Sequence, residues 1–404
     1  MLQDRSIYLN FFSYLCFRQG KMAFVAGPRQ VGKTFLTELL IQARGGGYYH
    51  TWDDVVFKRQ WMQDPKQLVP DRPGQKPLVV FDELHKAPRW KSSLKGVYDL
   101  RKKSADIVVT GSARLDVFRK GGDSLLGRYY LMRLHPFSLG EVSGGFLRSP
   151  DSLLDSLNRD LPEERDLYER LLTFGGFPEP FLKSDPTVWN LWKRTRLERI
   201  IREDIFDVAK THEIALLESC AALVPTRVGS LFSYQSLSED LSVSPPTIRR
   251  WIDWLSQLYY LYAVSPYAKT VVRSLRKQPK VYLWDWSEVP DQGAKFENLV
   301  AGHLLKACHY WTDMGLGLFE MNYVRDKEKR EVDFLITRDR KPWILVEVKL
   351  ADTKPSPHLK RFADVLNPAV VLQIIGIPGI HERMDVGKGR QGFLSSASKI
   401  LRLF

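Results

Sequence analysis

The chain carries, at residues 27–34, the octapeptide Gly27-Pro28-Arg29-Gln30-Val31-Gly32-Lys33-Thr34. It satisfies every required position of the pattern G-x-x-x-x-G-K-[ST]. Glycines let the backbone fold closely around a phosphate, with its N–H groups directed inward. The run before it, residues 22–26, predicts a buried strand, and residues 35–41 predict a helix whose N-terminal end favours an anion. We therefore expect all eight residues to form a phosphate-binding loop, with Lys33 on the β- and γ-phosphates and Thr34 on Mg²⁺.

A second apolar run, residues 78–81, ends in Asp82 and Glu83. A continuous apolar run is typical of a central parallel strand that is buried on both faces. Carboxylates at its C-terminal end would lie at the crevice where open α/β sheets bind ligands. We expect Asp82 to hold Mg²⁺, directly or through water, and Glu83 to polarise the attacking water.

Two further features follow along the chain. A third apolar run, residues 107–109, leads to Thr110 and Ser112, and a polar side chain there could report the γ-phosphate to the rest of the fold. Ser112 is the first candidate and Thr110 the second. Arg128, before a predicted strand at 129–134, is either an arginine finger or a solvated surface arginine; a finger accounts for roughly 10³–10⁵ in rate.

Six motifs occur in a fixed order: residues 27–34 (GPRQVGKT), 81–88 (FDELHKAP), 110–114 (TGSAR), 125–128 (LLGR), 136–141 (PFSLGE) and 175–179 (GGFPE). With them the chain resembles prokaryotic AAA-type P-loop ATPases of unknown function that carry a C-terminal domain of unknown function with a nuclease-like fold. His85 departs from the uncharged polar residue, such as Gln, expected at its position. The resemblance implies an α/β chain with four parts: an αβα ATPase core (1–144), a helical lid (145–225), a winged helix-turn-helix (226–290) and a PD-(D/E)XK restriction-nuclease-like domain (291–404).

Residues 236–262 read as a helix-turn-helix. The pattern predicts helices at 236–241 and 247–255, joined by a turn at 242–244, and Pro245 and Pro246 suit a helix start. No acid occurs between Asp253 and Asp285, which indicates a basic wing. The predicted DNA contacts are Arg249, Arg250, Lys269, Arg273, Arg276, Lys277 and Lys280. Five wing bases on phosphates would give a salt slope of about −4.5; the alternative is a winged helix that only connects domains.

The C-terminal region holds a second chemical pattern. Residues 331–336 and 343–349 predict a β-hairpin that places Asp333 opposite Glu347, with Lys349 on the same face as Glu347. Two carboxylates this close suit Mg²⁺, and a lysine beside them can position a water. Asp, then Glu-x-Lys, is the PD-(D/E)XK pattern, and Glu297 in a preceding helix supplies a further acid. The alternative is a hairpin with a surface Glu–Lys pair worth about 0–1 kcal/mol.

Composition limits the function classes. The formal net charge is +13 over 404 residues, which favours polyanionic partners such as DNA. Three scattered cysteines argue against a disulfide framework and fit a reducing cytosol. We expect a cytoplasmic ATPase that binds ATP or ADP with Mg²⁺, has no membrane segment, and leaves homo-oligomerisation open. Two hypotheses follow: ATP controls a DNA-binding, DNA-cleaving domain, or the chain is a nucleotide-switched scaffold with an inactive nuclease-like domain.

Overall fold

The computed structural model describes residues 5–71, 76–111, 125–201, 211–268, 278–387 and 389–404. It divides the chain into two compact units, Met1–His135 and Pro136–Phe404. Ser112, Lys269, Arg273, Arg276 and Lys277, all predicted site residues, lie outside the described ranges. No helix in the described part of the chain is both long and apolar enough to span a bilayer.

The first unit is built on a five-stranded parallel sheet in the order β2-β3-β4-β1-β5. Its strands are β1 (Met22–Ala26), β2 (Gly47–Thr51), β3 (Leu78–Asp82), β4 (Asp106–Gly111) and β5 (Tyr129–Arg133). Every residue of β1, β3 and β4 is buried, as the continuous apolar runs predicted. Strand β1 lies between β4 and β5, so the order of the strands switches at β1, and a ligand crevice is expected where β1 and β4 end.

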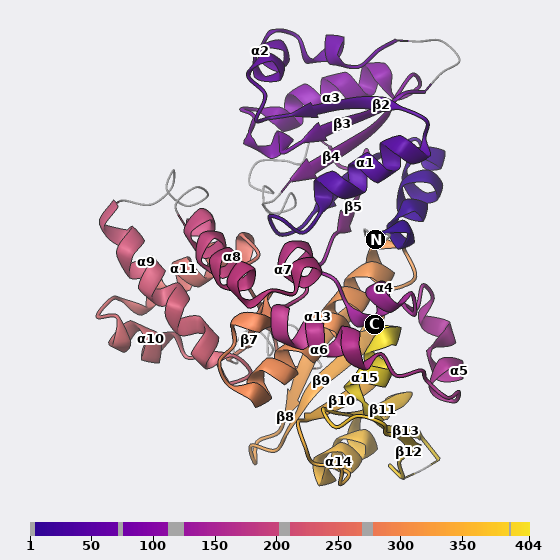
Figure 1. The fold of residues 1–404 in the computed structure, drawn as a ribbon, viewed down its shortest axis with the longest axis vertical. Helices are drawn as coiled ribbons and strands as arrows, with labels where there is room; N and C mark the ends of the chain where they lie inside the picture. The colour runs from indigo at the N-terminus through magenta and orange to yellow at the C-terminus, as the bar shows by residue number, and fades with distance from the viewer. Residues whose placement is uncertain (1–4, 72–75, 112–124, 202–210, 269–277, 388) are drawn as a thin grey trace. The chain divides into compact units, whose positions relative to one another are not determined.

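In the described part of the first unit, three α-helices cover this sheet: α1 (Lys33–Ala43), α2 (Val55–Gln63) and α3 (Trp90–Arg101). The side chains of α2 and α3 share one apolar cluster with alternate strand residues, among them Phe24, Phe81 and Val109. Helix α1 lies on the opposite face of the sheet, as Figure 1 shows. Helices therefore cover both faces of the sheet, as right-handed connections between parallel strands allow. The sheet therefore holds the ends of β1, β3 and β4 at fixed positions beside the start of α1.

The second unit begins with short helices. They are α4 (Leu139–Ser143), α5 (Leu153–Leu157), α6 (Arg165–Phe174), α7 (Pro178–Lys183), α8 (Pro186–Arg199) and α9 (Thr211–Leu223). Gly175 separates α6 from α7 with a φ of +79°, and a Cβ at this position would come within 2.3 Å of Asp285 Oδ1. The glycine is therefore required both by its backbone conformation and by the close approach of Asp285.

Two helices and a hairpin follow. Helix α10 (Tyr234–Asp240) and helix α11 (Pro245–Gln257) are each capped by a serine hydroxyl, from Ser233 and Ser244. Strand β6 (Leu261–Val264) then pairs antiparallel with β7 (Lys280–Leu283). The two predicted helices are thus confirmed, each within a few residues of its expected bounds.

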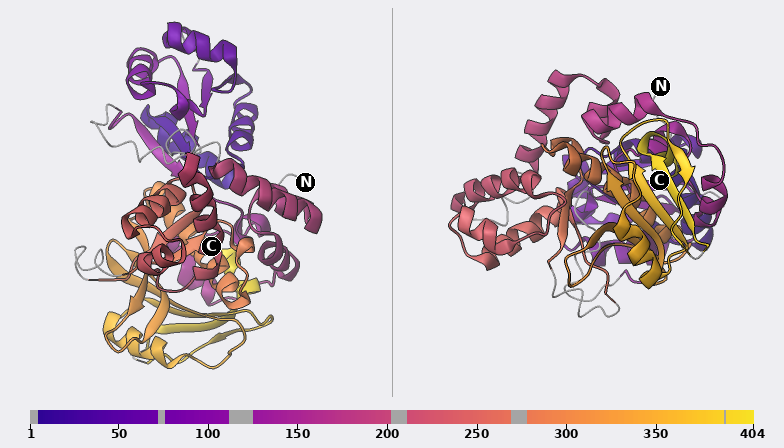
Figure 2. Two further views of the ribbon diagram at one scale, coloured as in Figure 1. Left: turned by 90° about the vertical axis from the view of Figure 1, so that its left-hand side faces the viewer. Right: turned by 90° about the horizontal axis from the view of Figure 1, so that it is seen from below.

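The C-terminal part holds a six-stranded sheet in the order β12-β13-β11-β10-β9-β8, drawn from orange to yellow in Figure 2. The strands are β8 (Phe319–Arg325), β9 (Glu331–Arg338), β10 (Lys341–Lys349), β11 (Val370–Ile375), β12 (His381–Arg383) and β13 (Gln391–Ser396). The helices are α13 (Gln292–Asp313), α14 (Pro357–Leu366) and α15 (Ala397–Ile400). Strands β8, β9 and β10 form an antiparallel meander, and α14 connects β10 to the parallel strand β11.

The division between the two compact units falls at residue 135, and residues 136–144 pack within the second unit. The amide of Leu139 donates to His303 Nε2 at 2.8 Å. The ammonium of Lys306 donates to the Glu141 carboxylate and, at 3.0 Å, to the carbonyl of Pro136. His303 and Lys306 both belong to α13, so this long helix holds the segment that sequence patterns assigned to the ATPase core.

Candidate functional site

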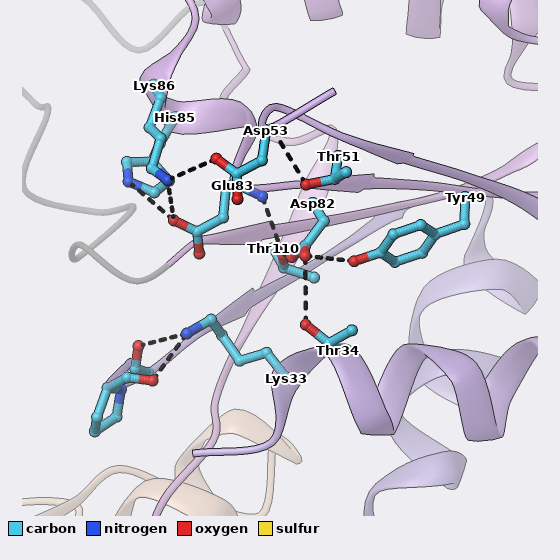
Figure 3. Close-up of polar contacts among 12 residues, drawn as sticks. Lys33, Thr34, Tyr49, Thr51, Asp53, Asp82, Glu83, His85, Lys86 and Thr110 are labelled. Atoms are coloured by element: carbon cyan, nitrogen blue, oxygen red, sulfur yellow. Dashed lines mark hydrogen bonds and ion pairs between the residues drawn. The ribbon is translucent and has the colours of Figure 1, made fainter. Parts of the chain in front are cut away.

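The motif at residues 27–34 runs from the end of β1 into the first turn of α1, which begins at Lys33, as the pattern requires. Gly32 caps α1 in the left-handed region, with a φ of 94°. A Cβ on Gly27 would stand 2.3 Å from the carbonyl oxygen of Leu134, so only glycine fits there. Lys33 is buried, and its ammonium donates to the carbonyls of Gly27 and Pro28 at 3.1 and 2.8 Å (Figure 3). The lysine thus lies inside the curve of its own loop.

Asp82 ends β3 and receives hydrogen bonds from three hydroxyls of three different elements (Figure 3). Thr34 Oγ1 lies 3.4 Å from Asp82 Oδ2, and the Thr110 hydroxyl donates to Oδ1. The Tyr49 hydroxyl, from the neighbouring strand β2, donates to Oδ2. Burial, then the hydrogen bond to Asp82, raises the pKa of Tyr49, which keeps its proton available for donation.

A divalent cation fits this first site. Mg²⁺ prefers oxygen ligands from a hydroxyl and a carboxylate, together with nucleotide phosphates. Thr34 and Asp82 present that pair side by side, next to the loop that would hold the phosphates. Thr34 and Asp82 are therefore the residues that would hold Mg²⁺.

Glu83 adopts a left-handed backbone, with a φ of 55°. Such a conformation is costly for a residue other than glycine and occurs often at functional sites. Its amide donates to Thr110 Oγ1 at 3.3 Å, and its carboxylate lies 3.4 Å from Lys86 Nζ and 3.8 Å from His85 Nε2. Burial lowers the pKa of His85 to about 4 despite the attraction of Glu83, so this imidazole is neutral at pH 7.

Arg128 pairs with an acid of α3 in the same unit. Its Nε and one terminal nitrogen lie 2.9 and 3.2 Å from the two carboxylate oxygens of Asp99. This two-point hydrogen bond lowers the pKa of Asp99. A role as a finger would require Arg128 to leave this geometry.

The predicted C-terminal hairpin is confirmed. Strands β9 and β10 pair antiparallel with Phe334 opposite Val346, which places Asp333 and Glu347 next to each other across the pair. Asp333 Oδ2 accepts from the Val348 amide at 2.8 Å, and Lys349 Nζ lies 2.7 Å from Glu347 Oε1. Burial, followed by repulsion from Asp333, raises the pKa of Glu347 to about 7.

Glu297, from α13, joins the same cluster, as predicted from its position in a helix before the hairpin. Burial and then repulsion from Asp333 raise its pKa to about 7. Its Oε1 accepts from the Tyr282 hydroxyl at 2.6 Å and lies 3.3 Å from Lys280 Nζ. The structure therefore brings together all four residues predicted for this site: Glu297, Asp333, Glu347 and Lys349.

Lys280 contradicts its predicted role. We expected it to contact DNA from a wing, but its side chain is only 3% exposed. Its ammonium lies 2.6 Å from Glu331 Oε1, 3.3 Å from Glu297 Oε1 and 3.6 Å from Asp333 Oδ1. Burial lowers the pKa of this lysine, but the attraction of the three carboxylates outweighs burial and raises it overall.

A divalent cation does not fit this second site. Mg²⁺ needs ligand oxygens at about 2.0–2.1 Å. The carboxylates of the cluster surround an ammonium at hydrogen-bond distances instead. Within the described residues, no group of three or more His, Cys, Asp or Glu side chains is arranged to hold a metal ion. Asp333 and Glu347, predicted as metal ligands, therefore meet a lysine where the metal was expected.

The basic residues of α11 are exposed. The Arg249 guanidinium lies over the Tyr234 ring at 4.9 Å, and Arg250 lies over Trp254 at 5.3 Å. Arg250 also pairs with Glu213 of α9 at 2.9 Å. Both side chains are thus on the surface, as DNA contact requires, although each already has a partner.

Sequence reasoning missed two side chains that shape these sites, Tyr49 and Glu331, and assigned a third, Lys280, to DNA contact. Tyr49 is brought to Asp82 only because β2 pairs with β3. Lys280 opens a strand whose four residues are all buried, and this apolar run was the available signal. Glu331 stands two residues before Asp333 on β9, and period-two alternation puts both on one face.

Comparisons with known proteins match three regions of the chain, and the first match extends eight residues beyond the division at residue 135. Residues 19–143 match a family described as an AAA domain, while residues 165–288 and 292–376 match two families described as domains of unknown function, DUF8612 and DUF4143. The first match supports an AAA-type P-loop ATPase, and the last supports a C-terminal domain of unknown function.

Similar proteins occur in distant bacteria. An uncharacterized protein of Mycobacterium tuberculosis is 22% identical over 375 residues, which cover 89% of this chain and 77% of that protein. An uncharacterized protein of Haemophilus influenzae is 26% identical over 303 residues, 69% of each chain. Among solved structures, the Bacillus subtilis DNA clamp loader delta protein aligns with 62% of this chain and 87% of its own, at 9% identity and a TM-score of 0.27, too low to support an inference.

Proposed function

We propose that this chain is a Mg²⁺-dependent ATPase whose nucleotide state controls DNA binding by its second unit. The observation that supports the ATPase most directly is the meeting of Thr34, Asp82 and Thr110 beside the phosphate loop. The AAA-domain match of residues 19–143 supports the same activity. Thr34 and Asp82 would hold Mg²⁺, which would supply positive charge to stabilise the charge that develops during phosphoryl transfer.

The other residues of the site have separate roles in binding and hydrolysing ATP. The loop amides and Lys33 bind the β- and γ-phosphates, which requires the ammonium to exchange the carbonyls of Gly27 and Pro28 for phosphate oxygens. Glu83 orients and polarises the attacking water. Thr110 contacts both the Asp82 carboxylate and the Glu83 amide, so it is placed to sense changes at either residue. Ser112 stays the other sensor candidate.

Lys33→Ala tests the ATPase. We expect ATP hydrolysis to be lost, because no other cation of the loop occupies this buried position. Arg59→Ala, which removes an exposed positive charge from α2 of the same unit, should hydrolyse ATP at the wild-type rate. The rate of phosphate release, measured at saturating ATP and Mg²⁺, distinguishes the two variants. Equal rates in Lys33→Ala and the wild type would reject the phosphate-loop assignment.

DNA contact is proposed from the exposed Arg249 and Arg250 on α11 and from the basic composition of residues 269–277. With Lys280 withdrawn, four wing bases remain, and about −0.9 per phosphate gives an expected salt slope of about −3.6 for them. Fluorescence anisotropy with labelled duplex DNA, in ATP and in ADP, measures both affinity and slope. Arg276→Glu with Lys277→Glu should weaken binding and flatten the slope; an unchanged isotherm would make this region a connector between domains.

DNA cleavage at Asp333, Glu347 and Lys349 was the other expectation for the second unit. The contacts of Lys280 weigh against it, so we infer that the cluster is inactive in the wild-type chain and that the nuclease-like fold serves as a scaffold. Linear and supercoiled DNA, incubated with Mg²⁺ or Mn²⁺ with and without ATP, test this inference. Cleavage by the wild type that disappears in Glu347→Ala would contradict it. Stimulation of ATP hydrolysis by DNA would still favour a DNA-processing enzyme over a nucleotide switch that does not respond to DNA.

A further inference from the structure

The acidic cluster of the second unit already contains a cation. Four carboxylates, from Glu297, Glu331, Asp333 and Glu347, gather where α13, β9 and β10 meet, and the ammonium of Lys280 lies within 4 Å of three of them. Arg325 takes the second oxygen of Glu331 at 2.7 Å, and Lys349 takes one oxygen of Glu347 at 2.7 Å. Three bases therefore face four acids in this cluster.

Burial and its contacts with carboxylates hold the Lys280 side chain in this position. It is the first residue of β7, and its ammonium reaches the cluster from a side chain that is only 3% exposed. A buried ammonium without carboxylate partners would lose several kcal/mol of hydration that nothing replaces. The approach of the main chain closes the cluster further, because a Cβ on Gly229 would come within 3.2 Å of Glu297 Oε2. These contacts leave the cluster enclosed around the lysine.

Glu347 supplies a second and independent observation. It is 3% exposed, and its Oε2 has no well-aligned hydrogen-bond donor among the described residues, although a contact with Ser356 lowers the pKa of this carboxyl. Burial, and then repulsion from the neighbouring Asp333, raises the pKa of Glu347. A buried carboxylate oxygen without a donor is the kind of ligand atom that a cation completes. Glu347 Oε2 is therefore a buried ligand atom beside the oxygen of the same carboxylate that Lys349 contacts.

We propose that Lys280 is the resident cation of this cluster, so that the wild-type second unit binds no divalent metal there, and that removing this ammonium opens a latent divalent-cation site formed by Glu297, Asp333 and Glu347, with Glu331 at its edge. The lysine keeps the carboxylate oxygens apart at ammonium distances and repels a second cation. Without it, the carboxylates can close on an ion that accepts oxygen ligands. This inference does not depend on ATP hydrolysis by the first unit.

Manganese binding to the full chain tests the proposal. The nucleotide-free protein, stripped with EDTA and desalted, is titrated with Mn²⁺, and free Mn²⁺ is counted by electron paramagnetic resonance. We expect Lys280→Met to bind one Mn²⁺ more per chain than the wild type, at least about tenfold more tightly than any wild-type site in the second unit, because a unit-charge repulsion at close range is gone. Adding Asp333→Asn to Lys280→Met should remove the extra ion.

Two controls make the outcome specific. Lys399→Met removes another lysine of the second unit that pairs with one acid, Asp160, and it should bind Mn²⁺ as the wild type does. Lys280→Arg keeps the charge and should also match the wild type. Weak binding near Thr34 and Asp82 is common to all these proteins and cancels in the comparison.

Either of two results would overturn the proposal. One is a folded Lys280→Met protein that binds no additional ion. The other is a wild-type chain that loses one Mn²⁺ when Asp333→Asn is introduced alone, because the wild type would then already hold a metal. If Lys280→Met does not fold, the second comparison decides: equal ion counts for the wild type and Asp333→Asn support the resident lysine, and unequal counts reject it.

Discussion

Lys306→Met should strongly destabilise the second unit. The ion pair between Lys306 and Glu141 is almost fully buried, with side chains 2% and 0% exposed, and Lys306 also donates to the Pro136 carbonyl. Methionine keeps the length of the side chain but removes the ammonium that the buried Glu141 carboxylate contacts. Removing one partner of a buried pair costs about 3–5 kcal/mol, whereas replacing both with apolar groups can be nearly neutral.

Scanning calorimetry of the full chain measures this effect. For a unit of this size, each kcal/mol of lost stability lowers the melting temperature by roughly 2–4 °C. The melting temperature of the second unit should therefore fall by about 10 °C. The double variant Lys306→Met with Glu141→Leu should recover a large part of the loss. Bound nucleotide should raise the transition of the first unit more than that of the second, which identifies the two transitions.

Arg165→Met provides the matched control. Arg165 pairs with Glu169 four residues away on α6, and both side chains are more than half exposed. Such a pair contributes about 0–1 kcal/mol, so the transition should hardly move. A Lys306→Met protein no less stable than Arg165→Met would refute the reasoning that joins residues 136–143 to α13.

Three further predictions concern the first unit. Tyr49→Phe removes a hydrogen bond to the Asp82 carboxylate, and since such bonds contribute about 1.5–3 kcal/mol, kcat for ATP should fall roughly tenfold; an unchanged kcat would make Tyr49 dispensable. Gly27→Ala places a Cβ against the Leu134 carbonyl, so affinity for a fluorescent ATP analogue should fall at least roughly tenfold, and an unaltered Kd would contradict this. The pKa of His85 is about 4 in the fold and about 6.5 in the unfolded chain, so protonation favours unfolding: stability should fall as pH drops from about 6.5 to 4, by up to about 3 kcal/mol. The transition of the first unit in His85→Gln should be less sensitive to pH over this range, and parallel pH profiles would argue against a buried neutral imidazole.

Local patterns predicted the elements that carry the chemistry. The strands at 22–26 and 78–82 and the hairpin of β9 and β10 follow from apolar runs and alternation that a few neighbouring residues specify. Glu297 was predicted to lie near the hairpin because an acid on a preceding helix fits the family pattern. In the structure its carboxylate contacts Lys280 and Tyr282. These predictions needed no knowledge of the order of strands in a sheet.

Contacts between distant segments could not be predicted in this way. Tyr49 reaches Asp82 across 33 residues because β2 lies beside β3, which only the sheet order reveals. Lys280 stands in a stretch without acids, so local charge suggested a solvated base, while its carboxylate partners lie 17 to 53 residues further along the chain. Composition therefore predicted the sign of the charge but not whether the side chain meets solvent or a buried acid.

The position of the unit boundary has a practical consequence for gene fragments. A fragment that ends at residue 144 includes Leu139 and Glu141 but not His303 and Lys306, the α13 side chains that satisfy them. It would expose an apolar, charged tail that is buried in the full chain, and such tails promote aggregation during expression. A fragment that ends at residue 135 keeps all five strands of the first sheet and leaves that tail with the unit to which it belongs.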